Sequence, residues 1–221
     1  ETQEVYYLFD YAKGELPRLN TAKPILVFVS HGHTDHYNPE VFSLLTSLKM
    51  EHITAVLSND IPGKRLPSCL KLTTREESGQ VRCQGFIPAV KVYHSQDYAL
   101  PFHTQLKTLL STDRGVAFFL TCAEGTIYHA GDLNDWSIEE TPEQERRQMT
   151  GSYLASIRAL KGKAIDIAFL PLDPRLGKYY AKGFLTFLKT IPVKHVYPMH
   201  YWEQPEIIAK FLQEYPEYAD I

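Results

Sequence analysis

The sequence has no long apolar run, few cysteines and almost no excess of charge. No stretch approaches the roughly 20 apolar residues that cross a bilayer, and no signal peptide is visible, so we expect neither a membrane span nor export. The three cysteines are odd in number and lack the spacing of metal-binding cysteines, which predicts buried free thiols in a reducing cytoplasm. The formal net charge of −3 does not predict the broad basic surface of a nucleic-acid-binding protein. We therefore expect a cytoplasmic protein without a broad nucleic-acid-binding surface, although a local basic patch could still exist.

One stretch, from Ile25 to Tyr37, is rich in residues that bind metals. Its first half, Ile-Leu-Val-Phe-Val-Ser, is a continuous apolar run that predicts a strand buried on both faces. Its second half, His-Gly-His-Thr-Asp-His from His31 to His36, places three imidazoles and a carboxylate where that strand ends. Imidazole nitrogen and carboxylate oxygen are the ligands that zinc and similar ions take. The stretch therefore predicts a metal site at the rim of a sheet.

The length of 221 residues and the 44% hydrophobic composition predict one domain, residues 1–221, with a well-buried core. The expected strands cover residues 5–10, 25–30, 53–57, 69–72, 81–83, 86–93, 106–110, 115–121, 126–130, 165–170 and 194–197. The expected helices cover residues 39–49, 139–160 (either continuous or divided at Gly151), 182–190 and 206–215. Glu124-Gly125 predicts a hairpin turn between two of the strands. This order favours an α/β domain of the α+β type, with two packed sheets and helices outside, over a doubly wound parallel sheet.

Polar side chains follow several of the expected strands at the point where each strand ends. His31 to His36 follow one strand, Asp132 follows a second on a glycine hinge, and His200 follows the last. A fourth strand end carries Asp173 and Arg175. Ligands at the ends of several strands combine the rigidity of a sheet with the reach of loops. We therefore expect these side chains to meet at one edge.

This arrangement resembles the metallo-β-lactamase superfamily. The run from His31 to His36 matches its His-x-His-x-Asp-His signature, and Gly131-Asp132 and His200 follow in that family's order. Three further segments are similar to a branch of mostly uncharacterised bacterial hydrolases, itself distantly similar to ascorbate-6-phosphate lactonase: Tyr128–Trp136, Leu170–Arg175 and Pro198–His200.

The resemblance implies a four-layer αββα sandwich with its metal site between the rims of the two sheets. It implies a first metal on His31 and His33, a second on Asp35 and His36, a bridging Asp132, and His200 completing the second site. The implied metal is zinc, as one or two ions, with manganese, iron and nickel as alternatives. Asp10 is similar to the aspartate near the start of this fold, which implies that the family's first strand lies before Glu1.

The chain departs from the family at one position. Members of the superfamily usually carry another ligand histidine near the start of the strand expected from Gly115. Here the sequence reads Ser111-Thr-Asp-Arg-Gly115, without a histidine. Either the first site has one ligand fewer, or Asp113 or water takes that place.

The expected chemistry follows from the metal. A divalent metal lowers the pKa of a coordinated water to about 7, so that hydroxide forms at neutral pH. We expect catalytic roles for Asp35 and Asp132, either of which could orient this water or move its proton. Arg175 has two interpretations: it clamps a carboxylate or phosphate of the substrate, or it forms a salt bridge with Asp173 that holds the loop.

The favoured function is a metal-dependent hydrolase that uses metal-bound hydroxide on a small ester, lactone or phosphorylated metabolite. An alternative is a nuclease or phosphodiesterase of the same superfamily, which ranks lower because such enzymes usually carry a basic nucleic-acid-binding region. A non-catalytic metal-binding domain is the third interpretation, which the absent histidine permits. Cleavage of β-lactams is not expected, because the members that hydrolyse antibiotics are exported.

Overall fold

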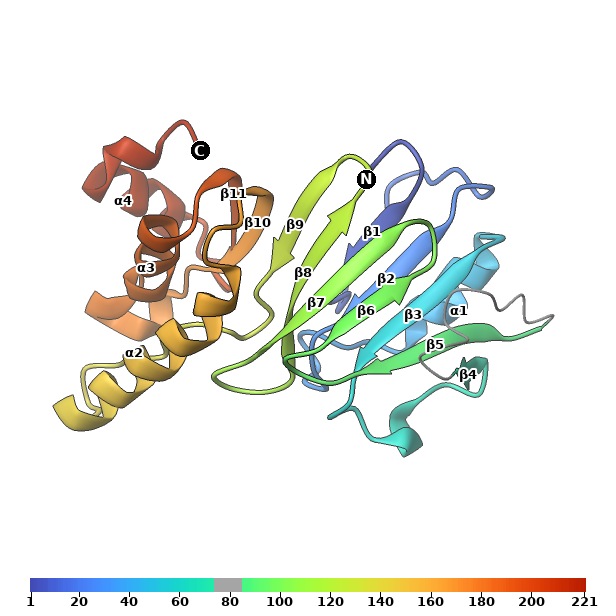
Figure 1. Cartoon of the computed structure of the whole chain (residues 1–221), viewed down its shortest axis with the longest axis horizontal. Coiled ribbons are helices and arrows are strands. Elements are labelled where there is room, and N and C mark those ends of the chain that lie inside the picture. The colour runs from blue at the N-terminus through green and yellow to red at the C-terminus, as the bar shows by residue number, and fades with distance from the viewer. Residues whose placement is uncertain (74–84) are drawn as a thin grey trace.

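The computed structural model describes residues 1–73 and 85–221 and contains two β-sheets with helices outside them (Figure 1). The first sheet has the strand order β1-β2-β3-β5-β4, and all of its neighbouring strands are parallel. Its strands are β1 (Tyr6–Phe9), β2 (Ile25–Val29), β3 (Ile53–Ser58), β4 (Leu70–Leu72) and β5 (Ile87–Val92). Strand β2 is buried along its whole length, as a continuous apolar run requires.

The second sheet has the order β11-β10-β9-β8-β7-β6. Strands β9, β10 and β11 are parallel, whereas β6 to β9 pair antiparallel. The strands are β6 (Asp97–Leu100), β7 (Thr104–Leu110), β8 (Val116–Cys122), β9 (Gly125–His129), β10 (Ile165–Pro171) and β11 (Val193–Met199). The hairpin of β8 and β9 closes with Cys122 opposite Gly125, which confirms the turn expected at Glu124-Gly125.

Three apolar clusters define four layers. Between the sheets, Phe28 of β2 packs in one cluster with Phe118 of β8. The outer face of the first sheet packs against Phe42 of α1, and the outer face of the second packs against Tyr153 of α2 and Phe184 of α3. The helices are α1 (Glu40–Ser47), α2 (Glu143–Ile157), α3 (Lys182–Thr190) and α4 (Glu206–Glu214), and Figure 1 shows the last three together beside β10 and β11. The layer order is αββα, which confirms the expected fold class.

Two helices begin later than the sequence predicts. Helix α2 begins at Glu143 rather than at residue 139, because Pro142 and the residue before it resist the helical conformation. It then runs through Gly151 without a division. Helix α1 begins at Glu40, whose N–H donates a hydrogen bond to Asn38 Oδ1 (3.0 Å).

Strand β6 is not expected from the sequence, and the strand expected at residues 81–83 lies outside the described residues. Cys69 and Cys122 are free thiols, as predicted, but both are partly exposed rather than buried. Cys83 lies outside the described ranges. No helix in residues 1–73 and 85–221 is both long enough and apolar enough to cross a membrane.

Candidate metal centre

The loops that follow β2, β9 and β11 bring histidines and aspartates together at one edge of the sandwich. Because β9, β10 and β11 are parallel, their carboxyl ends lie at the same edge of the second sheet. A backbone hydrogen bond from the N–H of Val116 to the carbonyl oxygen of Ser30 (3.0 Å) attaches the end of β2 to that sheet. The six side chains expected to bind metal lie here, in two groups of three.

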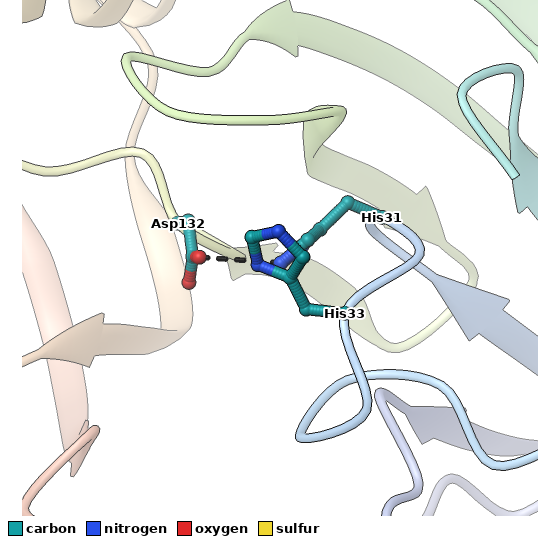
Figure 2. Close-up of side chains that lie close together, drawn as sticks. All are labelled: His31, His33 and Asp132. Carbon is teal, nitrogen blue, oxygen red and sulfur yellow. Dashed lines mark ion pairs between the residues drawn. The ribbon is translucent and has the colours of Figure 1, made fainter.

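The first group consists of His31, His33 and Asp132, whose candidate ligand atoms all lie within 4.8 Å of one another. Figure 2 shows the two histidines on one loop and Asp132 approaching from the opposite side. His31 Nε2 lies 3.2 Å from Asp132 Oδ2, and the rings of His31 and His33 are 4.6 Å apart. His31 and Asp132 are buried, whereas His33 is exposed, so the group opens to solvent on one side.

The second group consists of Asp35, His36 and His200, again within 4.8 Å of one another. His36 Nε2 lies 3.1 Å from His200 Nε2 and 3.6 Å from Asp35 Oδ2. Asp132 Oδ1 lies 3.1 Å from His36 Nε2 and 2.9 Å from His200 Nε2. The carboxylate of Asp132 therefore faces both groups, with one oxygen toward each.

The chemistry of this cluster fits a divalent cation. Among the described residues, His31 Nε2 and Asp132 Oδ1 are buried without a hydrogen-bond partner. Yet Asp132 Oδ2 lies close to the first of these atoms, and His200 Nε2 lies close to the second. Buried polar atoms are otherwise nearly always paired in folded proteins. His31 Nε2 and Asp132 Oδ1 are therefore available to bind a cation, and imidazole nitrogen with carboxylate oxygen is the donor set of zinc and related ions.

Asp10 supports the second group from behind. Its Oδ2 lies 2.8 Å from His36 Nδ1, and its carboxylate also accepts hydrogen bonds from the N–H of Ser30 (2.7 Å) and from Ser30 Oγ (2.6 Å). An N–H at Nδ1 directed at Asp10 leaves the lone pair of His36 on Nε2, which faces His200 and Asp132. Such carboxylate–histidine pairs orient metal ligands in many proteins.

Burial and neighbouring charged groups shift the pKa values of this cluster in opposite directions. Burial acts to lower the pKa of His36, but the carboxylates of Asp10 and Asp132 outweigh it and raise this pKa to about 10. Burial likewise acts to lower the pKa of His200, and Asp132 and Asp173 raise it to about 8. Burial acts to raise the pKa of Asp132, but the imidazoles of His200, His31 and His36 hold it far below the usual range. Without metal, protons on His36 and His200 therefore balance part of the negative charge of these carboxylates.

A second loop clamps the backbone of the histidine loop. The N–H of Gly32 donates a hydrogen bond to Asp60 Oδ2 (3.2 Å), and Arg65 Nη1 donates to the carbonyl oxygen of Gly32. The guanidinium of Arg65 also lies over the ring of Tyr37, 5.2 Å from its centroid, and Tyr37 Oη donates to the carbonyl oxygen of Arg65 (3.0 Å). Both backbone groups between His31 and His33 are therefore held by side chains. The sequence carries no signal for this clamp beyond a turn.

Asp173 and Arg175 form a pair beside His200. Arg175 Nε donates to both carboxylate oxygens of Asp173 (3.0 and 3.1 Å), and Trp202 Nε1 donates to Oδ2 (3.2 Å). The same Oδ2 lies 3.4 Å from His200 Nδ1. The salt bridge that was one of the two interpretations of Arg175 is therefore formed, while 54% of the Arg175 side chain stays exposed.

Asp113 and His129 lie outside both groups in the described part of the chain. Burial lowers the pKa of His129 to about 4, and its Nδ1 accepts a hydrogen bond from the N–H of Gly131 (3.1 Å). Its ring stacks on Phe9 with centroids 4.8 Å apart. His129 is thus a neutral residue that holds the start of the loop carrying Asp132.

No family model matches this chain, and a search of curated proteins finds no match either. Among solved structures, the chain is similar to YhfI from Bacillus subtilis, a metallo-β-lactamase fold protein, with 11% identity over 87% of this chain and 72% of that one (TM-score 0.45). It is similar to CmlA from Streptomyces venezuelae, a diiron β-hydroxylase, with 11% identity over 91% of this chain and 43% of that one (TM-score 0.46).

A third similar structure is the metallo-β-lactamase MIM-2, with 15% identity over 79% of this chain and 62% of that one (TM-score 0.36). TM-scores below 0.5 at this identity describe a loose likeness. The architecture and the site therefore rest on the strands and side chains of this chain itself.

Proposed function

We propose that this chain is a metal-dependent hydrolase of the metallo-β-lactamase superfamily, acting on a small ester, lactone or phosphorylated metabolite. The observation that carries the proposal is the meeting of two three-residue ligand groups around one buried carboxylate, Asp132. The His-x-His-x-Asp-His run supplies four of the six side chains, and the two loops after β9 and β11 supply the others. In this proposal His31, His33 and Asp132 hold one ion, and Asp35, His36 and His200 hold another.

The number of ligands supports a catalytic role over a structural one. Structural zinc sites are closed by four protein ligands, whereas catalytic sites use three and keep an open position. The first group offers three side chains, of which His33 is exposed, so an ion held there would keep an open position. The second group also offers three, with Asp35 exposed, and Asp132 Oδ1 faces it as a fourth donor. A divalent cation held here would acidify a coordinated water and polarise the bond to be cleaved.

The chain's own residues have separate tasks in this proposal. Asp35, with 40% of its side chain exposed, is the carboxylate positioned to accept the proton of an attacking water. Asp132 is held ionised by three imidazoles, so it stays a ligand and an acceptor throughout the neutral pH range. Arg175 supplies positive charge beside the groups, because its pair with Asp173 holds the guanidinium while leaving half of the side chain open to an anionic substrate.

The test combines metal analysis with a substrate panel. Purified protein would be loaded with Zn²⁺, Mn²⁺, Fe²⁺ or Ni²⁺, its metal content measured, and turnover assayed on esters, lactones and phosphoesters before and after chelation. Asp132→Ala is expected to lose both metal and turnover, and Asp113→Ala, a matched aspartate in neither group, is expected to keep both.

Each other outcome contradicts part of the proposal. Unchanged metal content in Asp132→Ala would show that the two groups are not the metal site. Bound metal without turnover across the panel would favour a non-catalytic metal-binding domain. Salt-dependent affinity for RNA with phosphodiester cleavage would favour the nuclease.

A further inference from the structure

A second polar site lies between α2 and the segment that leads into α3. It is a hollow of about 360 Å³, a size in the range of small-molecule pockets, and none of its lining residues belongs to either metal-ligand group. The lining residues are Glu143, Arg146, Arg147, Thr150, Tyr179 and Lys182. The four from α2 are three or four positions apart, so one face of the helix forms a wall of the hollow.

The side of the hollow at Lys182 is built on a buried ion pair. Asp135 is fully buried, and its Oδ2 lies 3.0 Å from Lys182 Nζ. Lys182 Nζ also donates hydrogen bonds to Ser137 Oγ (2.9 Å) and Thr150 Oγ1 (2.6 Å). Because three acceptors surround Nζ, the lysine is fixed in place. Its ammonium group therefore lies beside the hollow in a fixed position, paired with Asp135.

Three cations gather around one aromatic ring at this place. The guanidinium carbon of Arg146 lies 5.5 Å from the centroid of Tyr179, and the Nζ atoms of Lys178 and Lys182 lie 5.4 and 5.5 Å from it. Like charges in such a cluster repel one another unless anions compensate them. Lys178 has Glu139 as its partner, and Lys182 has Asp135.

Arg146 is the cation without a carboxylate partner among the described residues. It donates instead to the backbone carbonyl oxygens of Glu139 and Thr141, which position the guanidinium without neutralising it. Beside it, Arg147 pairs with Glu143, and both side chains of that pair are largely exposed, 79% and 67%. Exposed pairs of this kind contribute little to stability, so an incoming anion could replace Glu143 at Arg147.

We propose that this hollow binds a phosphate group, either free or as the monoester of a small metabolite. The two arginines offer planar, forked donors that match phosphate oxygens. Lys182, paired with Asp135, holds the wall of the hollow beside them in a fixed position. Tyr179 lines the same hollow and offers an aromatic ring and a hydroxyl to the rest of an ester. The site takes its ligand without a metal, so it does not depend on the hydrolase activity proposed above.

The experiment measures phosphate binding to chelator-treated protein by titration calorimetry, first with inorganic phosphate and then with glycerol phosphate. Saturable binding to the wild type is expected, and Arg146→Gln is expected to weaken it about tenfold or more, because charge-assisted hydrogen bonds are lost. Arg158→Gln makes the same charge change at an exposed position just after α2 and is expected to leave binding unchanged. Tighter binding of the ester would identify a metabolite as the source of the phosphate, and equal binding would identify the free anion.

A second variant keeps the test valid if Arg146→Gln unfolds. Glu143→Gln removes the competing carboxylate from the lining and is expected to tighten phosphate binding several-fold. The proposal is overturned if the wild type shows no saturable binding, if Arg158→Gln weakens binding as much as Arg146→Gln, or if Glu143→Gln leaves the affinity unchanged. Binding lost in His31→Ala but kept in Arg146→Gln would place the phosphate at the candidate metal centre and would also overturn it.

Discussion

Replacing Gly115 by alanine tests the contact that joins the two halves of the candidate metal centre. Gly115 has a φ of +66°, and a Cβ atom there would lie 1.9 Å from the carbonyl oxygen of Ser30 and 2.6 Å from the Cβ atom of His31. The carbonyl group of Ser30 and the side chain of His31 can move away from this added Cβ atom only if the end of β2 moves with them. We therefore expect Gly115→Ala to act on stability and on metal binding together.

The size of the effect follows from two contributions. The left-handed conformation costs a residue with a Cβ atom about 1–2 kcal/mol relative to glycine. Overpacking at a closed site adds about 1–3 kcal/mol. The free energy of unfolding should therefore fall by about 2–5 kcal/mol, which for a domain of this size lowers the Tm by about 4–20 °C. Because the overlap pushes on His31, which lies 3.2 Å from Asp132, affinity for the first metal should fall as well.

The assay compares thermal unfolding of the chelator-treated variant with wild type and measures Zn²⁺ binding by equilibrium dialysis. Gly151→Ala is the matched control, because it lies within α2 with no atom within 4 Å of an added Cβ. It should stabilise the protein by about 0.5–1 kcal/mol and leave metal binding unchanged. A Gly115→Ala protein that unfolds at the wild-type temperature and binds Zn²⁺ with the wild-type affinity would refute the close approach.

Three further predictions concern the residues around the ligands. Asp10→Asn removes the carboxylate at His36 Nδ1 and should weaken metal affinity about 10- to 100-fold in dialysis, with only a small change in the folded spectrum. Arg65→Ala releases the carbonyl oxygen of Gly32 and should weaken metal affinity, which Arg65→Lys should partly restore; an Arg65→Ala protein with wild-type affinity would contradict the clamp. In the metal-free protein the pKa of His36 is raised to about 10, so its stabilising charge is fully present below about pH 6.5 and is lost as the pH rises through 10. Urea unfolding of chelator-treated protein should show that loss, and His36→Gln should abolish it.

The two-sheet architecture could be predicted from the sequence because its signals are local. The buried run of β2 and the hairpin at Glu124-Gly125 each lie within a few residues, and both elements occur where they are expected. Strand β6 (Asp97–Leu100) could not be recognised, because four residues carry too short a pattern. The late start of α2 could have been predicted from Pro142. A proline disfavours the helical conformation of the residue before it, and this effect outweighed the helix-forming residues that precede it.

The ligand loops could be recognised because their signal is also local. The residues that hold these loops in place could not be recognised. His31 to His36 form a compact pattern, whereas Asp60 and Arg65 reach Gly32 from 28 and 33 residues away. Lys182 and Ser137, which form a hydrogen bond beside the hollow at α2, are 45 residues apart. Contacts of this kind arise only when separate elements fold together, and a single sequence has no pattern that marks them.

The segment without the expected histidine, Ser111 to Gly115, has a structural task that explains its composition. Gly115 lies where the end of β2 comes closest to β8, and the backbone hydrogen bond from Val116 to Ser30 forms directly beside it. Thr112 Oγ1 donates a hydrogen bond to the carbonyl oxygen of Asn134 (2.6 Å), in the loop that carries Asp132. The segment therefore holds together the two loops from which the first group is built. Thr112 and Gly115 serve that attachment, and the first group is left with three ligands and its exposed side at His33.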